Sequence, residues 1–480
     1  MKRVSLLFCV LVALAFITVS CKKIESVKQG IANTETFDAI KLHPEKPNII
    51  LIMAEDMGYE IPTANGGQSY QTPSLNRMAQ QGMRFTQCHG SPMCAPSRWM
   101  LMTGKYGFRN YFYYGKMYTD QRTFANMLQD AGYQTGIYGK WALDGGDTSV
   151  RTFGFDNYLI WNPYKGPLPD GKETAKQNQA EKGSIYMNTR VYHEGAFLPD
   201  SLMQGKFSDD VFTDSVLNFI KVNKNKPFFA YYPMILSHIP ACPTPDNPEY
   251  ATWDPGLGID DTSFFPSQVK YADKKIGEII DKVNKLGISG ETVVIVLFGD
   301  NGTREGITSM FNGLVVQGAR EQPTEIGTHV PMFIYWPGTI AAGSVNKDLI
   351  DFTDFLPTLA GIANVPVPTN YGKIDGVSFY PRLLGQAGTP REWIYDWYWP
   401  VPNRPALQTF YAWAQTKDYK LYDSTSLTMK GEYYKLINDI TEQQPALNID
   451  SLTNRERNTR TTLLNVLKAQ HNDPEYRSRY

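Results

Sequence analysis

Five short apolar runs without polar alternation constrain the fold of this 480-residue chain most strongly. They cover residues 47–54, 135–138, 227–234, 292–298 and 330–336. A strand that is buried on both faces, as in a parallel sheet, has this unbroken pattern, whereas a half-exposed strand alternates. Helical patterns at 72–81, 123–131 and 267–286 lie between the runs. This succession predicts a doubly wound α/β domain.

The composition excludes several classes of protein. The chain has 47 Lys and Arg against 48 Asp and Glu, and 42% of its residues are hydrophobic. This balance is typical of a folded globular protein and argues against a general nucleic-acid binder, which needs a clustered positive excess. Five scattered cysteines argue against a disulfide scaffold, and six histidines without close pairing argue against a zinc site of the HExxH kind.

The N-terminus has the layout of an export signal. A basic start is followed by an apolar run at 6–19, which is shorter than the about 20 residues of a membrane span. Ser20 before Cys21 resembles a bacterial lipoprotein cleavage site, although an ordinary signal with a chance cysteine has the same layout. We expect a signal peptide at 1–20, a lipid on Cys21 and a polar linker at 21–46. The protein would then lie in the bacterial cell envelope, in the periplasm or on the outer membrane, with that lipid as its only membrane contact.

Polar side chains follow four of the predicted strands. They are Glu55, Asp56, Lys140, His238, Asp300 and Asn301. Ligands in open α/β sheets bind beyond the carboxyl ends of the strands, so these groups are expected at one edge. The carboxylates and the amide offer only oxygen ligands, which suit Ca²⁺ or Mg²⁺. The lysine and histidine can hold an anion or protonate a leaving oxygen, so transfer of a sulfuryl or phosphoryl group is indicated.

A short helix is predicted between the first two strands, which are the apolar runs at 47–54 and 135–138. Pro96 suits its first turn and Gly104 its end, which places Cys94 at the helix N-terminus. That end stabilises anions, and Arg98 lies one turn further on. A small buried cysteine beside a surface arginine is the alternative from the residues alone.

The segment Cys94-Ala-Pro96-Ser97-Arg98, followed by Leu101-Met-Thr103-Gly104, resembles the signature of the formylglycine-dependent sulfatases, the arylsulfatase family. The segments 47–59, 139–141, 237–240, 298–302 and 325–331 follow the same family in order, and the likeness covers residues 47–445. It implies an alkaline-phosphatase-like fold, with a mostly parallel sheet in a catalytic domain at 47–365. A smaller C-terminal subdomain at 366–480 would contain an antiparallel sheet, with strands near 410–415 and 419–422 and a helix near 451–468.

The resemblance also implies a mechanism. A maturing enzyme would oxidise Cys94 to formylglycine, whose hydrate gives one oxygen to a cation and attacks sulfur with the other. The cation, Ca²⁺ rather than Mg²⁺, would be held by Glu55, Asp56, Asp300, Asn301 and the residue made from Cys94. Arg98 would support the hydrate, Lys140 would bind the sulfate, and His238 would protonate the departing alcohol. The implied activity is hydrolysis of sulfate esters, with sulfated carbohydrates as the expected substrates.

Three positions depart from the family pattern. Glu55 stands where the family has aspartate, and Arg320 stands where it has a late active-site lysine. Ala142 follows Lys140-Trp141 where the family has a histidine that acts as a base, and a methyl group cannot accept a proton. We hypothesise that His89, five residues before Cys94, takes part of that role, with a purely structural histidine as the alternative.

Two other functions are consistent with these departures. The loss of the histidine at position 142 suits a non-catalytic sulfate- or glycan-binding lipoprotein, and the superfamily also contains phosphodiesterases and phosphonate hydrolases. The intact motif at Cys94 favours the enzyme, and the extra histidine ligands of the two-metal members are not found. Two aromatic runs remain: 393–399 is predicted to be core rather than a sugar platform, and 106–118 is predicted to line the pocket.

Overall fold

Four neighbouring parallel strands form the centre of the large sheet. In spatial order they are β10 (Thr292–Leu297), β1 (Asn48–Met53), β9 (Phe228–Pro233) and β5 (Gln134–Lys140). Every residue of β1, β9 and β10 is buried, so the apolar side chains are covered on both faces of the sheet. The apolar runs at 47–54, 135–138, 227–234 and 292–298 are therefore confirmed as parallel strands, whereas the run at 330–336 forms an antiparallel strand.

The computed structural model describes residues 45–113, 115–164, 185–399, 411–437 and 439–477. Pro44–Tyr480 form one unit, and the predicted division at residue 366 stays a prediction. The predicted signal peptide, the lipidation at Cys21 and nearly all of the linker lie outside the described residues. Within those ranges, every helix is too short or too polar to cross a bilayer.

The two sides of the central strands differ in direction. On one side lie β6 (Asn157–Trp161), parallel to β5, and the short β7 (Tyr192–His193) and β8 (Ala196–Phe197). On the other side lie β13 (His329–Tyr335), β2 (Met83–His89), β14 (Ser344–Asn346) and β15 (Ile350–Asp351). β13 runs antiparallel to β10 because the chain returns through the hairpin β11 (Thr308–Phe311) and β12 (Leu314–Gln317) without crossing the sheet.

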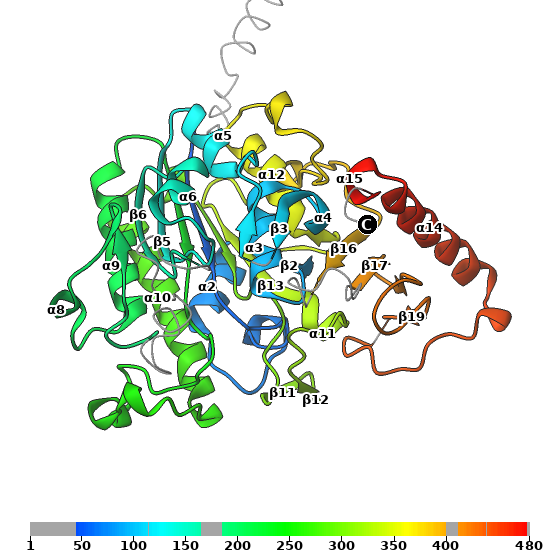
Figure 1. Cartoon of the computed structure of the whole chain (residues 1–480), viewed down its shortest axis with the longest axis horizontal. Helices are drawn as coiled ribbons and strands as arrows, with labels where there is room; N and C mark the ends of the chain where they lie inside the picture. Colours follow the sequence, from blue (N-terminus) through cyan, green and yellow to red (C-terminus); the bar gives the residue numbers. More distant parts are fainter. Residues whose placement is uncertain (1–44, 114, 165–184, 400–410, 438, 478–480) are drawn as a thin grey trace, which may run out of the picture. The chain divides into compact units, whose positions relative to one another are not determined.

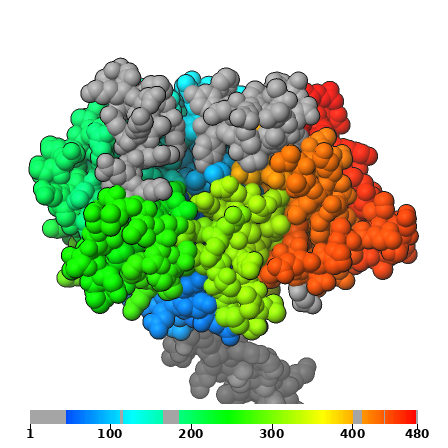
Figure 2. All heavy atoms as spheres, turned by 60° about the horizontal axis from the view of Figure 1, so that its bottom comes forward, coloured from blue at the N-terminus to red at the C-terminus, as the bar shows by residue number. Residues whose placement is uncertain are grey.

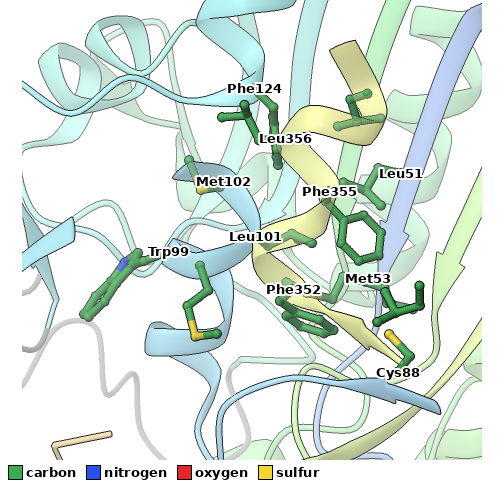
Figure 3. Close-up of a cluster of buried hydrophobic side chains, with 14 of the residues drawn as sticks. Leu51, Met53, Cys88, Trp99, Leu101, Met102, Phe124, Phe352, Phe355 and Leu356 are labelled. Atoms are coloured by element: carbon green, nitrogen blue, oxygen red, sulfur yellow. The ribbon is translucent and has the colours of Figure 1, made fainter. Parts of the chain in front are cut away.

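Alternate side chains of β1 belong to two cores, one on each face of the sheet. Ile50 and Ile52 pack with α2 (Pro73–Gln81), α9 (Ser208–Asn223) and α10 (Phe265–Lys285). Leu51 and Met53 pack with α3 (Cys94–Thr103), α5 (Phe124–Asp130) and α12 (Phe355–Ile362), and Figure 3 shows them facing Phe355 and Leu101. Figure 1 shows the two sets of helices on either side of the sheet. This is the layered α/β architecture that the sequence predicts.

The C-terminal part of the chain forms a small antiparallel sheet, as predicted. Its strands are β16 (Ile394–Tyr398), β17 (Tyr411–Gln415), β18 (Tyr419–Tyr422) and β19 (Tyr433–Lys435). The long helix α14 (Asn454–His471) packs on β17 and β18. The remaining elements are the hairpin β3 (Tyr111–Tyr113) and β4 (Lys116–Met117) and the short helices α4 (Gly107–Asn110), α6 (Gly146–Thr152), α8 (Asp200–Met203), α11 (Glu325–Thr328), α13 (Tyr380–Leu383) and α15 (Pro474–Arg477).

Both aromatic runs contribute side chains to the buried core. Tyr395 and Trp397 are buried in the core, as predicted for the run at 393–399. Tyr106 and Tyr111 are also buried, against Tyr395 and Trp397 at ring-centroid distances of 5.0 and 5.8 Å. The prediction that these two tyrosines line the pocket is therefore wrong, because both rings pack in the core against Tyr395 and Trp397 of β16.

Candidate active site

The carboxyl ends of the four central strands bring the predicted acidic residues together. The Glu55 amide, just beyond β1, donates to the carbonyl of Leu236 beyond β9 at 2.8 Å. The Asp56 amide donates to Oδ1 of Asp300, beyond β10, at 3.2 Å. Glu55, Asp56 and Asp300 are all fully buried or nearly so. Three carboxylates thus meet at one edge of the sheet, as the strand-end rule predicts.

Helix α3 begins at Cys94 and ends before Gly104, which adopts the left-handed conformation at φ 68°. Ser97 fixes the approach to the helix, because its Oγ accepts from the Ser91 amide and donates to the Ser91 carbonyl, both at 2.9 Å. Residues 95–103 are buried, whereas Cys94 is half-buried. The ligand atoms of Cys94, Glu55 and Asp300 all lie within 4.8 Å of one another.

Three cationic side chains neutralise the carboxylates. Lys140 Nζ lies 2.5 Å from Oε2 of Glu55, and Arg98 pairs with the other oxygen of that carboxylate. Arg98 also lies 3.3 Å from Asp300 Oδ2, and Arg320 donates to Asp56 Oδ2 at 2.8 Å. Burial alone would raise the pKa of Glu55, but Lys140 and Arg98 outweigh it and hold that pKa well below its usual range.

The acidic edge has the chemistry of a hard-cation site. Burial, and then the nearby Glu55 carboxylate, raise the pKa of Asp300 well above its usual range. Asn301 donates from Nδ2 to Asp56 Oδ1 at 2.9 Å, so the Oδ1 of Asn301 points away from Asp56. Among the described residues this Oδ1 is buried and has no hydrogen-bond partner. Carboxylate oxygens and a free amide oxygen are the donors that Ca²⁺ prefers, so the residues present fit such an ion.

His238 lies on the turn beyond β9 and is half-buried. Its Nδ1 donates to the carbonyl of Ile239 at 2.8 Å, since a carbonyl oxygen can only accept, and this leaves Nε2 as the free ring nitrogen. The ring packs edge-on against Trp161 at 6.1 Å between centroids. Burial, and then the charge of Lys140, lower the pKa of His238 to about 4.

The described contacts of the His89 ring are with His329 and Glu325. Its ring stacks on His329 at 4.7 Å, and Nε2 lies 3.8 Å from Oε1 of Glu325. Burial lowers the pKa of His89 to about 3, which makes the ring a weak proton acceptor. Cys94 is not among these contacts, so the role of His89 as a base stays a prediction.

Ala142 lies at the end of β5, two residues beyond Lys140, and is buried. Its amide donates to the carbonyl of Asn162 at 3.1 Å, and its backbone is in the left-handed region at φ 56°. Histidine is one of the residues that tolerate this conformation, so the backbone still suits the residue that the family has there.

One ion pair and one hydrogen bond hold the loop that carries Arg320. Arg304 and Asp260 make two hydrogen bonds, at 2.8 and 2.9 Å, and Lys420 donates to the carbonyl of Pro323. On the face shown in Figure 2 the yellow-green segment after β10 accordingly lies between green and orange segments. The role of Arg304 was missed from the sequence, because a lone basic residue in a loop carries no pattern. The role of Lys420 was missed because the residue lies in β18, where the sequence indicates only a strand.

A second missed group consists of buried polar side chains around Glu325, which lies in α11 just before β13. Glu325 accepts from Gln415 at 2.7 Å, and its backbone amide donates to Glu442 at 2.7 Å, which in turn pairs with Lys420 at 3.1 Å. These side chains join the large sheet to the C-terminal sheet. Glu325 is 90 residues from Gln415 and 117 residues from Glu442 in the chain, so no local signal marks these contacts.

Comparison with known proteins gives consistent matches. The sulfatase family model matches residues 47–365, and the model "N-sulphoglucosamine sulphohydrolase, C-terminal" matches residues 324–469. The chain is 31% identical over 369 residues to N-acetylgalactosamine-6-sulfatase of Mus musculus, covering 71% of this chain and 67% of that protein. It is 30% identical over 375 residues to arylsulfatase A of Bos taurus, covering 73% and 70%.

The fold also matches solved structures. The structure described as "BT4656 in complex with its substrate D-Glucosamine-2-N, 6-O-disulfate" superposes with a TM-score of 0.69 at 22% sequence identity. The match covers 90% of this chain and 99% of that one. At this identity the likeness establishes the shared fold.

Proposed function

The chain belongs to the sulfatase family and is a sulfuric ester hydrolase, and from this premise we propose that it removes sulfate from sugars through a formylglycine made from Cys94. The observation that carries the proposal is the position of Cys94. It lies at the N-terminus of α3, within 4.8 Å of Glu55 and Asp300 and beside the charges of Arg98 and Lys140. A nucleophile there faces both a cation site and anion-binding groups.

Two groups would complete the site. Formylglycine, which a maturing enzyme of the host would produce, would supply a hydrated aldehyde as the nucleophile toward sulfur. A divalent cation, which we propose to be Ca²⁺, supplies positive charge for the sulfate oxygens. The residues that would hold it are Glu55, Asp56, Asp300 and Asn301, together with the residue made from Cys94.

Lys140 and Arg320 hold the sulfate group, and Arg98 supports the hydrate beside them. Each is paired with a carboxylate at the edge of the sheet, which fixes its direction before a substrate arrives. Preorganised cations of this kind stabilise the charge that develops on the sulfate oxygens in the transition state. Arg320 can make two parallel hydrogen bonds to one sulfate, which a lysine cannot.

His238 protonates the departing alcohol. Its Nδ1 is held by the Ile239 carbonyl, so the proton that it can give is on Nε2. The sulfate ester adds negative charge beside the ring and thereby favours the charged imidazolium. For the second proton transfer, which the family assigns to a histidine at position 142, we keep His89 as the proposed base.

Three similarities support a sulfated sugar as the substrate. The relatives include an N-acetylgalactosamine-6-sulfatase, the C-terminal match is to an N-sulphoglucosamine sulphohydrolase, and one solved neighbour binds a disulfated glucosamine. An enzyme tethered to the cell envelope through a lipid on Cys21 would meet such glycans outside the cytoplasm. We propose this location from the signal-like N-terminus.

Mass spectrometry of the tryptic peptide 85–98 from the native host tests the nucleophile. Cys94 is expected to have lost its sulfur and gained an oxygen, whereas Cys88 in the same peptide keeps its thiol as an internal control. Unmodified thiols at both positions in an active preparation would refute the formylglycine. A panel of sulfated hexosamines and galactosides tests the substrate, and turnover of aryl sulfates alone would refute the sugar.

A further inference from the structure

The turn that carries His238 is held from behind by fully buried polar side chains that the proposed mechanism does not use. The turn comprises residues 234–239, directly beyond β9. Tyr186 and Asp209 are the side chains that grip it, and both are 0% exposed. Two buried polar groups aimed at one short turn are costly unless their hydrogen bonds are made, so the turn has a defined geometry.

Tyr186 holds the peptide group that precedes the one whose carbonyl orients the imidazole. Its hydroxyl lies 2.5 Å from the carbonyl oxygen of His238 and 3.3 Å from that of Ile235, and it can donate its single proton only to these acceptors. The His238 carbonyl belongs to the peptide that joins His238 to Ile239. The carbonyl of Ile239 is in turn the acceptor for Nδ1 of the imidazole at 2.8 Å. A rotation of the His238–Ile239 peptide would move the Ile239 carbonyl and would therefore turn the ring.

Tyr186 is itself fixed to α9. Its ring stacks on Phe207 at 5.5 Å between centroids and 11° between planes. Its carbonyl accepts from the Ser208 amide at 2.7 Å, at the first residue of that helix. The hydroxyl therefore projects from a fixed base, and its position does not depend on the turn that it holds.

Asp209 grips the other end of the turn. Its Oδ1 accepts from the amide of Ile235 at 3.2 Å and from the hydroxyl of Tyr232 at 3.1 Å. The carbonyl of Ile235 accepts from the His238 amide at 2.8 Å. On the front, the Ser237 amide donates to the carbonyl of Glu55 at 3.1 Å. The turn is thus clamped between the acidic edge of the site and the first turn of α9.

We propose that Tyr186, together with Asp209, is a positioning residue that directs Nε2 of His238 at the leaving oxygen of the sulfate ester. This rests on the proposed role of His238 as the acid. In that step the S–O bond breaks, its electron pair goes to the bridging oxygen, and the proton on Nε2 passes to the same oxygen to give the alcohol. Proton transfer needs about 2.6–3.2 Å between the heavy atoms, so a small turn of the ring costs rate.

The test measures how strongly the rate depends on the leaving group. A series of aryl sulfates with phenols of increasing basicity gives the slope of log kcat/KM against leaving-group pKa. Tyr186→Phe is expected to steepen the slope, with a loss of about tenfold for the most basic phenol and less than about twofold for 4-nitrophenyl sulfate, which needs no proton. Asp209→Ala is expected to do the same, and Asp209→Asn, which keeps the acceptor oxygen, is expected to restore the wild-type slope.

Tyr133→Phe is the matched control. Tyr133 is also a buried tyrosine that donates to a backbone carbonyl, that of Pro47 at 3.0 Å, but it lies at the amino ends of the strands. It is expected to leave the slope unchanged. If Tyr186→Phe and Asp209→Ala lower the rate equally for all phenols, or leave the slope at the wild-type value, the positioning role is refuted. If His238→Ala itself keeps the wild-type slope, the acid role in the proposed function fails as well.

Discussion

Replacing Glu55 with glutamine tests whether the acidic edge is an electrostatic unit. The carboxylate of Glu55 lies between Arg98 and Lys140, and the side chains of all three are at most 4% exposed. Glutamine has nearly the same shape and keeps one acceptor oxygen, but it removes the negative charge. The two cations would then remain buried against one carboxylate fewer.

The size of the effect follows from burial. Breaking a buried ion pair by neutralising one partner costs about 3–5 kcal/mol, because the other charge stays desolvated. At an unfolding entropy of about 2.1 cal/mol/K per residue, a unit of the size of Pro44–Tyr480 loses about 1 °C of Tm for each kcal/mol. We therefore expect Glu55→Gln to lower the Tm by about 3–5 °C in the presence of a chelator.

Thermal denaturation with and without calcium separates the two roles of Glu55. An ion at a hundredfold excess over its Kd stabilises the wild type by about 2.7 kcal/mol, or about 3 °C here. In Glu55→Gln this calcium-dependent shift is expected to shrink, since a ligand and a negative charge are gone. Asp281→Asn is the control, because it breaks the exposed pair with Arg77 and is expected to cost less than about 1 kcal/mol.

Two results would refute this reasoning. A loss of Tm no larger than that of Asp281→Asn would show that the buried charges of Arg98 and Lys140 are compensated elsewhere. A calcium-dependent shift as large as in the wild type would remove Glu55 from the cation site. Activity measured on the same samples then tells whether the charge or the fold limits turnover.

Three further predictions concern the side chains of Arg320, His89 and His471. Arg320→Lys, which restores the family residue, is expected to keep kcat/KM within about fivefold, and Arg320→Ala is expected to lose at least about a hundredfold, because the guanidinium beside Asp56 is absent. The His89 hypothesis predicts that His89→Ala lowers kcat with KM unchanged, and a wild-type kcat in a folded variant would exclude it. The hydrogen bond to Asp423 raises the pKa of His471, so the stabilisation from this pair is present below the usual histidine pKa and is lost as pH rises through the raised value. Between pH 5 and 8 the Tm of the wild type should therefore fall more than the Tm of His471→Gln. Parallel curves of Tm against pH for the two proteins would contradict this.

Much of the site follows from the sequence because parallel strands align their carboxyl ends. The apolar runs locate the strands, and the residues after them then have to meet, as the contacts of Glu55 with Lys140 and Asp56 with Asp300 confirm. The direction of β13 does not follow, because an apolar run has no polarity and the short hairpin return is a matter of the connection.

The supporting residues could not be predicted for a different reason. Asp209 lies in the first turn of α9, where an acidic residue is ordinary for any helix, and its partner Ile235 is 26 residues away. Tyr106 and Tyr111 have the composition of a pocket wall, and only the packing of the C-terminal sheet against them makes them core. Such roles arise from tertiary contacts that no local pattern specifies.

The strand order also determines when during synthesis the central sheet and the site at its edge can assemble. β1 is synthesised early, but its two neighbouring strands are residues 228–233 and 292–297, which follow much later. β2 likewise cannot pair with β13 until residues 329–335 have been synthesised. Non-local pairing of this kind is slow, and it leaves open strand edges until the last partner has emerged from the ribosome. The helix of Cys94 is therefore an early product that becomes part of a site only late, and a chain that ends before residue 292 carries the nucleophile motif without Asp300 to face it.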